Sequence, residues 1–271
     1  MTAPAFITRR MLLKDMGKAG LAMMLLGTAA CSPDETGGSS TTAIPGNSST
    51  TPSGSTTEGN VATTTIAAVT TTSAEAGQVW HRVNLDFVSA YIVYRGGEAA
   101  IVDTGVAGSE TAIEIGLGEI GLGWGDVAHV IATHKHPDHI GSLEAVIAAT
   151  GAPWYAGAAD IPAISASAEG TPLANGATIF GLQTIETPGH TPGHISMLDT
   201  AAGVLIAGDA LNGSDGGVAG PNAQFSEDIE TANLSVQDLA SFDYEVALFG
   251  HGEPLLAGAS TAVADLAASL G

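Results

Sequence analysis

The chain has 271 residues, of which 45% are hydrophobic and only 13% are charged, and its formal net charge is −21. Four of the seven basic residues lie in the first 18 positions, which leaves Arg82, Arg95 and Lys135 for the rest of the chain. A surface this negative repels phosphate backbones and anionic lipid head groups, so the composition argues against a nucleic-acid substrate.

The first 31 residues resemble an export signal. Arg9 and Arg10 precede an apolar stretch, residues 21–26, that is too short to span a bilayer, and together they resemble a twin-arginine signal peptide. The residues before Cys31 resemble the cleavage box of bacterial lipoproteins, with Thr28 where leucine is commoner. Cys31 is the only cysteine, which excludes an intramolecular disulfide, and we expect it to be the lipid attachment site. The alternative is cleavage at a small-residue site beside an incidental cysteine.

Residues 32–76 are rich in Ser, Thr, Gly, Pro and Ala. Such a segment cannot bury enough apolar surface to offset the entropy lost on folding, so we predict a disordered linker. The folded part is then one domain of about 200 residues, residues 77–271. We expect the protein to be exported and located in the cell envelope, either as a membrane-anchored lipoprotein or in an extracytoplasmic compartment.

Beyond residue 77, apolar segments of strand length alternate with stretches of helical pattern, which predicts an α/β fold. The predicted strands cover residues 87–94, 99–103, 127–132, 153–156, 177–186, 195–199, 203–207 and 246–249. A hairpin turn is predicted at residues 95–98, where two glycines separate the first two strands. The predicted helices follow Ser109 and cover residues 142–149, 227–239 and 260–270.

Residues with side chains suited to chemistry follow the predicted strands. They are Asp103, residues 134–139, His190, Asp209 and His251. Loops at strand ends on a rigid scaffold are where catalytic groups usually collect. If the strands form two sheets packed face to face with helices outside, these five loops can meet at one cleft.

Four side chains of metal-ligand type lie in the six residues that begin at His134. Because strand side chains alternate with period two, His134 and His136 can face one ion if the backbone is extended. Pro137 then fixes a turn, so Asp138 and His139 point elsewhere, toward a second ion.

The tetrapeptide Thr-Pro-Gly-His occurs twice in succession, at residues 187–190 and 191–194. The Pro-Gly pairs prevent a helix that would place both histidines on one face. His194 leads directly into an apolar strand, which favours His190 as the metal ligand.

Asp209 and His251 each follow an apolar strand and complete a set of five histidines and two carboxylates. These nitrogen and oxygen donors suit zinc and are acceptable for iron or manganese. In the order His-x-His-x-Asp-His, then His, Asp and His, the set resembles the metallo-β-lactamase superfamily over about residues 79–256. The resemblance implies an αββα sandwich of two mixed β-sheets flanked by helices, with residues 77–271 as the catalytic domain.

The resemblance also implies a site for two metal ions, expected to be Zn²⁺, with Fe or Mn as the alternatives. The expected ligands are, for one ion, His134, His136 and His190, and, for the other, Asp138, His139 and His251, with Asp209 bridging the two. Such a pair of ions would lower the pKa of a shared water from near 16 to roughly 7, which would make a bridging hydroxide available as the nucleophile. Asp138 is the candidate catalytic residue that briefly takes the proton.

Asp103 matches an aspartate that this family has near its site. Because the ligand positions are already filled, we expect Asp103 to orient a histidine or a loop through a hydrogen bond. A turn-capping role before Gly105 is the alternative. Residues 212–224, together with Tyr155, are a candidate pocket wall without an assigned role.

The Thr-Pro-Gly-His motif and the aspartate at position 209 resemble those of glyoxalase II-type thioesterases and related lactonases. Zinc β-lactamases typically have cysteine or serine at that position. Basic residues that could bind a glutathione carboxylate are nearly absent, so we expect a neutral small-molecule ester, lactone or thioester and membrane contact only through the lipid. Three alternatives stay open: a β-lactamase-like amide hydrolase, a mononuclear iron persulfide-dioxygenase-like oxidoreductase, and a non-catalytic metal-binding surface lipoprotein.

Overall fold

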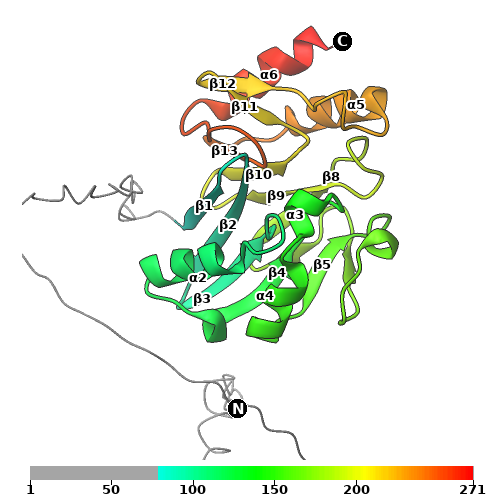
Figure 1. The fold of residues 1–271 in the computed structure, drawn as a ribbon. Coiled ribbons are helices and arrows are strands. Elements are labelled where there is room, and N and C mark those ends of the chain that lie inside the picture. The colour runs from blue at the N-terminus through cyan, green and yellow to red at the C-terminus, as the bar shows by residue number, and fades with distance from the viewer. Residues whose placement is uncertain (1–78, 271) are drawn as a thin grey trace, which may run out of the picture. The chain divides into compact units, whose positions relative to one another are not determined.

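The computed structural model describes residues 79–270, drawn as the coloured ribbon in Figure 1. The predicted signal peptide (residues 1–31), the lipid attachment at Cys31 and the predicted linker (residues 32–76) lie outside these residues and remain predictions. Within residues 79–270, no helix has the length and the apolar character needed to cross a membrane.

The first sheet contains six strands, whose order in space follows the chain: β1 (Trp80–Leu85), β2 (Val88–Arg95), β3 (Glu98–Val102), β4 (Val127–Ile131), β5 (Trp154–Gly157) and β6 (Thr171–Leu173). The first three strands pair antiparallel, and β3 to β6 pair parallel. Parallel pairing requires crossover connections. These contain α2 (Glu110–Glu119) and the short η1 (Trp124–Asp126), then α3 (Pro137–Ile140) and α4 (Leu143–Thr150), and finally η2 (Ile161–Ala163).

The second sheet contains five strands in the order β13-β10-β9-β8-β7. Their bounds are β7 (Thr178–Ile179), β8 (Leu182–Glu186), β9 (Ile195–Asp199), β10 (Val204–Gly208) and β13 (Val246–Phe249). The strands from β7 to β10 are antiparallel, and β13 joins β10 in parallel after the crossover helix α5 (Ile229–Leu239). A two-stranded ribbon, β11 (Asn212–Ser214) and β12 (Gly217–Ala219), precedes α5, and α6 (Ala259–Ser269) follows β13.

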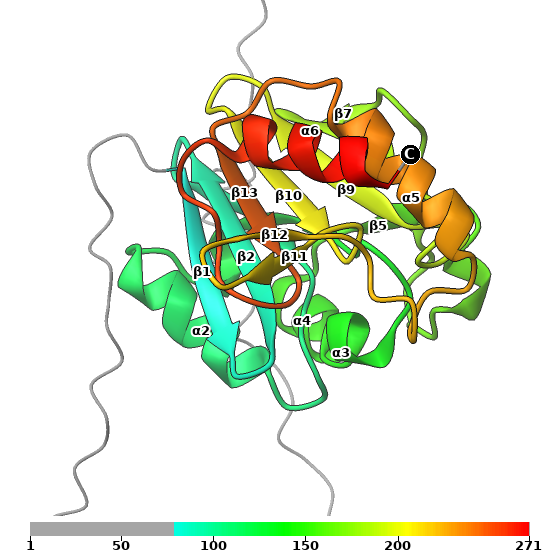
Figure 2. The same cartoon turned by 90° about the horizontal axis from the view of Figure 1, so that it is seen from above.

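Alternation along the strands divides the core into layers. In β2, Ala90 and Ile92 pack in a cluster with side chains of α2 and α4, whereas Tyr91 and Val93 pack in a second cluster with strands of the other sheet. Strand β10 alternates in the same way between this inter-sheet cluster and a third one formed with α5 and α6. In Figure 2 the strands lie between α5 and α6 on one side and α2, α3 and α4 on the other. The predicted αββα sandwich of two mixed sheets is therefore confirmed.

Strand direction brings the loops of interest to one edge of the sandwich. In the first sheet β3 and β4 are parallel, so the loops that follow them leave from the same end. In the second sheet β8, β10 and β13 all run in the same direction, because β8 and β10 are each antiparallel to β9 and β13 is parallel to β10. The loops after these five strands carry the predicted functional residues.

The N-terminal part of the first sheet differs from the prediction. Strand β1 was not expected, and Phe87, predicted to begin a strand, lies in the turn between β1 and β2. Asp86 precedes it with φ 75°, and its backbone N–H donates to Asn84 Oδ1 at 3.1 Å. An aspartate tolerates this left-handed conformation, so a local turn at residues 86–87 separates β1 from β2.

The single strand predicted for residues 177–186 is two strands. Phe180 and Gly181 form the two-residue turn between β7 and β8, and both have positive φ, 51° and 75°. This is the conformation that matches the twist of a hairpin. Strands β6, β11 and β12 were also not predicted; they are three-residue strands, and β6 contains a proline that is tolerated because β6 is an edge strand.

The four predicted helices all form, with ends shifted by one or two residues. Helix α5 begins at Ile229 because Asp228 caps it: the Asp228 carboxylate accepts a hydrogen bond from Thr231 N at 3.0 Å. Helix α2 forms although it contains two glycines. Gly116 faces the sheet there, and a Cβ at this position would lie 3.0 Å from Val83 Cγ2. The glycine thus allows the close approach of helix and strand.

Candidate metal centre

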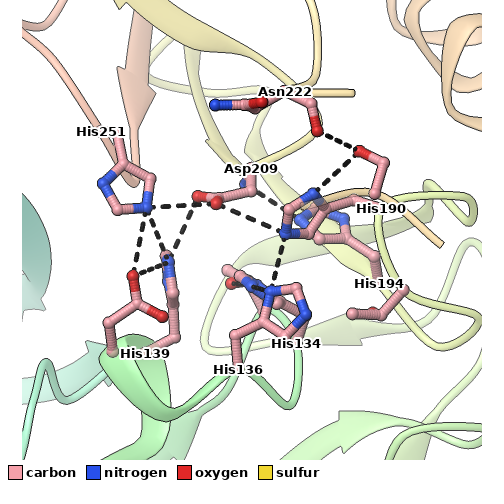
Figure 3. Close-up of polar contacts among 12 residues, drawn as sticks. His134, His136, His139, His190, His194, Asp209, Asn222 and His251 are labelled. Atoms are coloured by element: carbon pink, nitrogen blue, oxygen red, sulfur yellow. Dashed lines mark hydrogen bonds and ion pairs between the residues drawn. The ribbon is translucent and has the colours of Figure 1, made fainter. Parts of the chain in front are cut away.

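All seven side chains that the sequence predicted as metal ligands converge at this edge. They form three overlapping groups, in each of which the candidate ligand atoms lie within 4.8 Å of one another: His134, His136 and His190; His134, His139 and Asp209; and Asp138, His139 and His251. Figure 3 shows that Asp209 lies between His190 on one side and His251 on the other. The cluster therefore consists of two groups of donors that share one carboxylate.

Three imidazoles surround the centre of the first group. His136 Nδ1 lies 3.0 Å from His134 Nε2 and 2.9 Å from His190 Nε2. Two ligand atoms bound to one tetrahedral zinc ion at about 2.0 Å lie about 3.3 Å apart. The three nitrogen atoms are thus spaced as ligands of a single small cation.

The second group consists of two imidazoles and one carboxylate. His139 Nε2 lies 3.4 Å from His251 Nε2, and Asp138 Oδ2 lies 3.4 Å from His251 Nε2 and 3.8 Å from His139 Nε2. His139 is fully buried, whereas Asp138 and His251 are partly exposed. The second group is therefore the one that is more open to solvent.

Asp209 contacts both groups with its carboxylate. Its Oδ1 lies 3.3 Å from His139 Nε2, and its Oδ2 lies 3.2 Å from His251 Nε2 and 3.4 Å from His190 Nε2. The backbone makes this position possible because Gly250 lies against the carboxylate, where a Cβ would overlap Asp209 Oδ1. The Asp209 carboxylate thus contacts one histidine of the first group and both histidines of the second.

The backbone around the first motif is not the extended strand that was predicted. Strand β4 ends at Ile131, and residues 133–135 form a bend. His136 is then the N-cap of α3, with φ −66° and ψ 143°, and Pro137 is the first residue of that helix. The rings of His134 and His136 meet because the chain turns between them. Pro137 begins a helix rather than a turn, and Asp138 and His139, which follow it, lie in the second group of donors.

Asp103 supports both groups from behind. Its carboxylate accepts hydrogen bonds from Thr133 N at 2.7 Å, from Thr133 Oγ1 at 2.8 Å and from His139 Nδ1 at 2.9 Å. The Thr133 hydroxyl also lies 3.1 Å from His134 Nδ1, so it can accept from that ring while it donates to Asp103. Asp103 has φ 61°, a conformation that costs a non-glycine residue about 1 kcal/mol. Its bonds reach a histidine and a loop, as expected, rather than the turn at Gly105.

Two further contacts orient the other histidines. His251 Nδ1 lies 2.6 Å from the carbonyl oxygen of Phe87, and His190 Nδ1 lies 3.2 Å from Ser226 Oγ, which donates to the carbonyl oxygen of Asn222. In its neutral form, a ring whose Nδ1–H donates to such an acceptor has its lone pair on Nε2, the atom that faces the cluster. These partners were not predicted, because they lie 36 and 164 residues away from the histidines that they hold.

His194, the second histidine of the repeat, lies behind Asp209. It is buried, its Nδ1 is 2.7 Å from Thr187 Oγ1, and its Nε2 accepts a hydrogen bond from the Asp209 backbone N–H at 3.0 Å. The two histidines of the repeat thus have different positions, with His190 in the donor cluster and His194 in its support, as the sequence favoured.

Asp160 was missed by the sequence analysis. It is completely buried, and its carboxylate accepts hydrogen bonds from Thr191 Oγ1, from Gly193 N at 2.8 Å and from Lys135 N at 3.0 Å. It therefore fastens the loop of the first motif to the loop of the repeat. No spacing in the sequence marks this residue, since its partners lie 25 to 33 residues away.

The charges of the cluster are strongly coupled. Burial lowers the pKa of His134 well below its ordinary value and lowers the pKa of His190 to about 4. Burial also lowers the pKa of His139, but Asp209 and Asp103 outweigh this effect and hold it well above its ordinary value. Hydrogen bonds with Asp138 and Asp209 raise the pKa of His251 to about 10. In the protein without metal, the carboxylates thus favour the protonated forms of His139 and His251.

The donor set fits the metal ions that the fold family implies. Asp209 Oδ1 is buried and has no hydrogen-bond partner within residues 79–270, and an ionised oxygen in that position is stabilised by a cation. Three imidazoles form one group, and two imidazoles with a carboxylate form the other, a combination of donors that zinc favours and iron accepts. Each group could hold one ion, with Asp209 in reach of both.

A cavity of about 550 Å³ opens over the cluster. It is lined by His136, Asp138, Asp209 and His251 of the cluster, by Pro137, and by four residues that are not candidate ligands: Phe87, Asn212, Asn222 and Phe225. Two of the four come from residues 212–224, the predicted pocket wall. Tyr155 does not line the cavity and instead packs edge-on against His129.

Comparison with known proteins decides the family. The family described as the metallo-beta-lactamase superfamily matches residues 83–251, which is more than half of the chain. The chain belongs to this superfamily. The metallo-beta-lactamase family protein TTHA1429 from Thermus thermophilus has a similar structure, with a TM-score of 0.58 and 25% sequence identity over 71% of this chain and 79% of that protein.

Two relatives with more specific names match this chain over different lengths. The probable metallo-hydrolase YflN from Bacillus subtilis is 26% identical over 231 residues, which cover 67% of this chain and 86% of the relative. The hydroxyacylglutathione hydrolase of Rhodospirillum rubrum is 39% identical over 94 residues, which cover 33% of this chain and 36% of that enzyme. The chain therefore spans only about a third of the length of the second relative.

Proposed function

We propose that the protein is a metal-dependent hydrolase, with two zinc ions, that cleaves an ester, lactone or thioester bond. The observation that carries the proposal is the position of Asp209, which lines the cavity and whose carboxylate lies between two groups of donors. The similarity to a hydroxyacylglutathione hydrolase and to a probable metallo-hydrolase supports this class of reaction.

The residues suggest a division of tasks. His134, His136 and His190 would hold one ion, Asp138, His139 and His251 the other, and Asp209 both. When bound, such ions supply Lewis acidity and lower the pKa of a water molecule at the site from about 16 to roughly 7.

Asp138 lines the cavity and is the candidate proton acceptor. Its hydrogen bond with His251 lowers the pKa of the Asp138 carboxyl, so the group is ionised at neutral pH. Because Asp138 is only partly buried, it can pass a proton on to solvent. The carbonyl oxygen of Phe87 keeps the His251 ring oriented during this transfer.

Two observations separate this proposal from the other two enzyme classes. The second group of donors is complete, which a mononuclear iron oxidoreductase does not require. Asp209 stands where zinc β-lactamases typically have cysteine or serine, which disfavours a dedicated amide hydrolase.

One experiment tests the proposal directly. The purified protein is assayed on a panel of esters, lactones, thioesters, β-lactams and phosphodiesters, and its metal content is measured in the same sample. Hydrolysis of the first three classes with two zinc ions per chain is the expected result.

A matched pair of variants shows whether this activity belongs to the cluster. Asp209→Ala should abolish most turnover, whereas Asp243→Ala, which removes an exposed acidic residue at the other end of β13, should leave the rate unchanged. One iron per chain with oxygen consumption would instead assign the protein to the oxidoreductases, and two bound metals without any turnover would favour a non-catalytic role.

A further inference from the structure

Two exposed aromatic side chains line the cavity. Phe87 is 57% exposed and Phe225 is 59% exposed, and both lie on loops, the β1–β2 turn and the segment between β12 and α5. Exposed phenylalanine side chains that line one concave site are a common mark of a ligand-binding surface. Two such residues from segments far apart in the sequence indicate that the cavity binds an apolar group.

The two phenylalanines adjoin different donors of the metal centre. The Phe87 ring is nearly parallel to the His251 ring, with an interplanar angle of 11° and 6.2 Å between the ring centroids. Phe225 adjoins Ser226, whose hydroxyl contacts His190. Asp209 lies between His251 and His190 (Figure 3), so each phenylalanine borders the cavity next to a donor that flanks the shared carboxylate.

The charges of the cavity disfavour an anionic substrate. The three basic residues of the described chain are all in ion pairs: Arg82 with Glu253 at 2.7 Å, Arg95 with Asp199 at 2.6 Å, and Lys135 with Glu227 at 2.8 Å. Among residues 79–270, no lysine or arginine lines the cavity. A carboxylate on the substrate would therefore lose its hydration without gaining a basic partner.

Two neutral amide side chains also line the cavity, and they hold the wall in place. Asn212 Nδ2 donates to the Gly220 carbonyl oxygen at 3.0 Å, and Asn222 Oδ1 accepts from Gln224 N at 3.0 Å. These bonds fix the segment that carries Phe225. The wall thus offers uncharged polar groups and an aromatic ring, which suits a neutral ligand.

We infer that the substrate is an uncharged ester or thioester with a medium-length apolar acyl chain, which lies between Phe87 and Phe225. This inference rests on the proposed function, since it concerns the acyl group that the metal centre would release. Burial of one methylene group contributes enough free energy to change an affinity up to about fourfold. Because the cavity is open to solvent, each methylene group would be only partly buried and would contribute roughly half of this free energy. We therefore expect kcat/KM to rise about two- to threefold per methylene.

The test uses the full chain and p-nitrophenyl esters of acetate, butyrate, hexanoate and octanoate. It adds the p-nitrophenyl half-ester of adipate, whose acyl chain has the length of hexanoate but ends in a carboxylate. We expect kcat/KM to rise from acetate to hexanoate by about tenfold or more, and the adipate half-ester to be at least about tenfold poorer than hexanoate.

Phe87→Ala and Phe225→Ala should each lower kcat/KM for hexanoate by about tenfold, mainly through a higher KM, and should flatten the dependence on chain length. The backbone carbonyl that holds His251 remains in Phe87→Ala, so the loss reports on the ring. Ile115→Ala is the matched control, because Ile115 is also 59% exposed but lies on α2 and not at the cavity. It should behave like the unaltered protein.

A binding measurement separates this inference from the proposed function. Calorimetric titration of the metal-depleted protein with a medium-chain methyl ketone should show binding that both phenylalanine variants weaken and Ile115→Ala does not. Failure to hydrolyse any ester with two metals bound would overturn the proposed function, and the ketone titration would still decide the inference. Equal rates for hexanoate and the adipate half-ester, or a rate independent of chain length, would overturn the inference alone.

Discussion

The imidazole of His194 accepts a hydrogen bond from the backbone N–H of Asp209 at 3.0 Å. Because Nε2 is the acceptor, the ring proton must be on Nδ1, which lies 2.7 Å from Thr187 Oγ1. The Thr187 hydroxyl can then donate to Ser196 Oγ at 3.1 Å, which donates to the Ala207 carbonyl oxygen at 3.0 Å. In this series each group accepts one hydrogen bond and donates the next. It begins at the backbone N–H of Asp209 and ends at the carbonyl oxygen of Ala207, two residues earlier in the chain.

His194→Ala should therefore displace the backbone of Asp209. It leaves a buried N–H without an acceptor, which costs about 1–3 kcal/mol of stability. We also expect loss of metal from the site and a fall in kcat of about tenfold or more. His194→Gln can place an amide oxygen near the former Nε2 and should restore much of the metal content. Metal analysis and urea unfolding of both variants check this, and full metal occupancy of the alanine variant would contradict the supporting role.

Asp209→Ala should weaken both donor groups, since the carboxylate contacts His139, His190 and His251. We expect the more exposed second group to lose its ion first and turnover to fall by more than about hundredfold. Titration of the metal-depleted variant with zinc, followed by equilibrium dialysis, measures the two affinities separately. Two ions bound as tightly as in the unaltered protein would exclude the bridging role.

Asp103→Asn should affect the metal centre without a direct contact with either ion. The amide cannot accept from His139 Nδ1–H and from both donors of Thr133 as the carboxylate does. His139 then loses the partner that directs its Nε2 into the cluster. We expect zinc affinity to fall by about 10- to 100-fold, whereas the matched exposed variant Asp243→Asn should bind zinc as the unaltered protein does. Unchanged affinity in Asp103→Asn would favour a purely structural role for this residue.

The stability of the metal-free protein should decrease in mild acid. Burial lowers the pKa of His190 to about 4 and that of His194 to about 3, whereas both return to about 6.5 on unfolding. Between these values the unfolded chain binds more protons, so stability falls as the pH falls from 6.5 toward 4. The raised pKa of His251, about 10, acts in the opposite sense, but its stabilising contribution is complete below pH 6.5 and is lost only as the pH rises toward 10.

Urea unfolding with a chelator at about pH 6.5 and about pH 4.5 measures this effect. We expect the free energy of unfolding to fall by at least about 2 kcal/mol over this interval. His194→Gln should show a shallower dependence, because it lacks one of the titrating groups. An equal free energy of unfolding at the two pH values would show that protonation of the buried imidazoles does not destabilise the protein in acid.

Replacement of Arg9 and Arg10 by lysine should block export if residues 1–31 act as a twin-arginine signal. The readout is the fraction of the protein in the cell envelope against the fraction in the cytoplasm. Lys18→Arg, which keeps the charge and lies outside the arginine pair, is the matched control. Unchanged secretion of the lysine variant would remove the twin-arginine assignment.

The sequence by itself determined the layers and the donor set of this protein. Alternating burial in strands such as β2 and β10 depends only on the period of the strand, so it is visible in the order of residues. The donors are also visible, because a strand end followed by a histidine or an aspartate is a local feature. Two changes of backbone direction were not predicted: the turn at Phe180 and Gly181 and the bend at residues 133–135. Each lies within a short run of residues whose pattern is also compatible with a continuous strand.

Only the tertiary structure decided what surrounds those donors. Asp160, Ser226 and the Phe87 carbonyl oxygen hold the loops and rings of the cluster, yet each is an ordinary residue in its own segment. Their roles depend on which loops meet, and that is set by the packing of two sheets across one core. The same packing brings Phe87 and Phe225, from distant segments, into the lining of one cavity. The donors of the centre are thus readable from local sequence pattern, whereas the walls around them are set by contacts between distant parts of the chain.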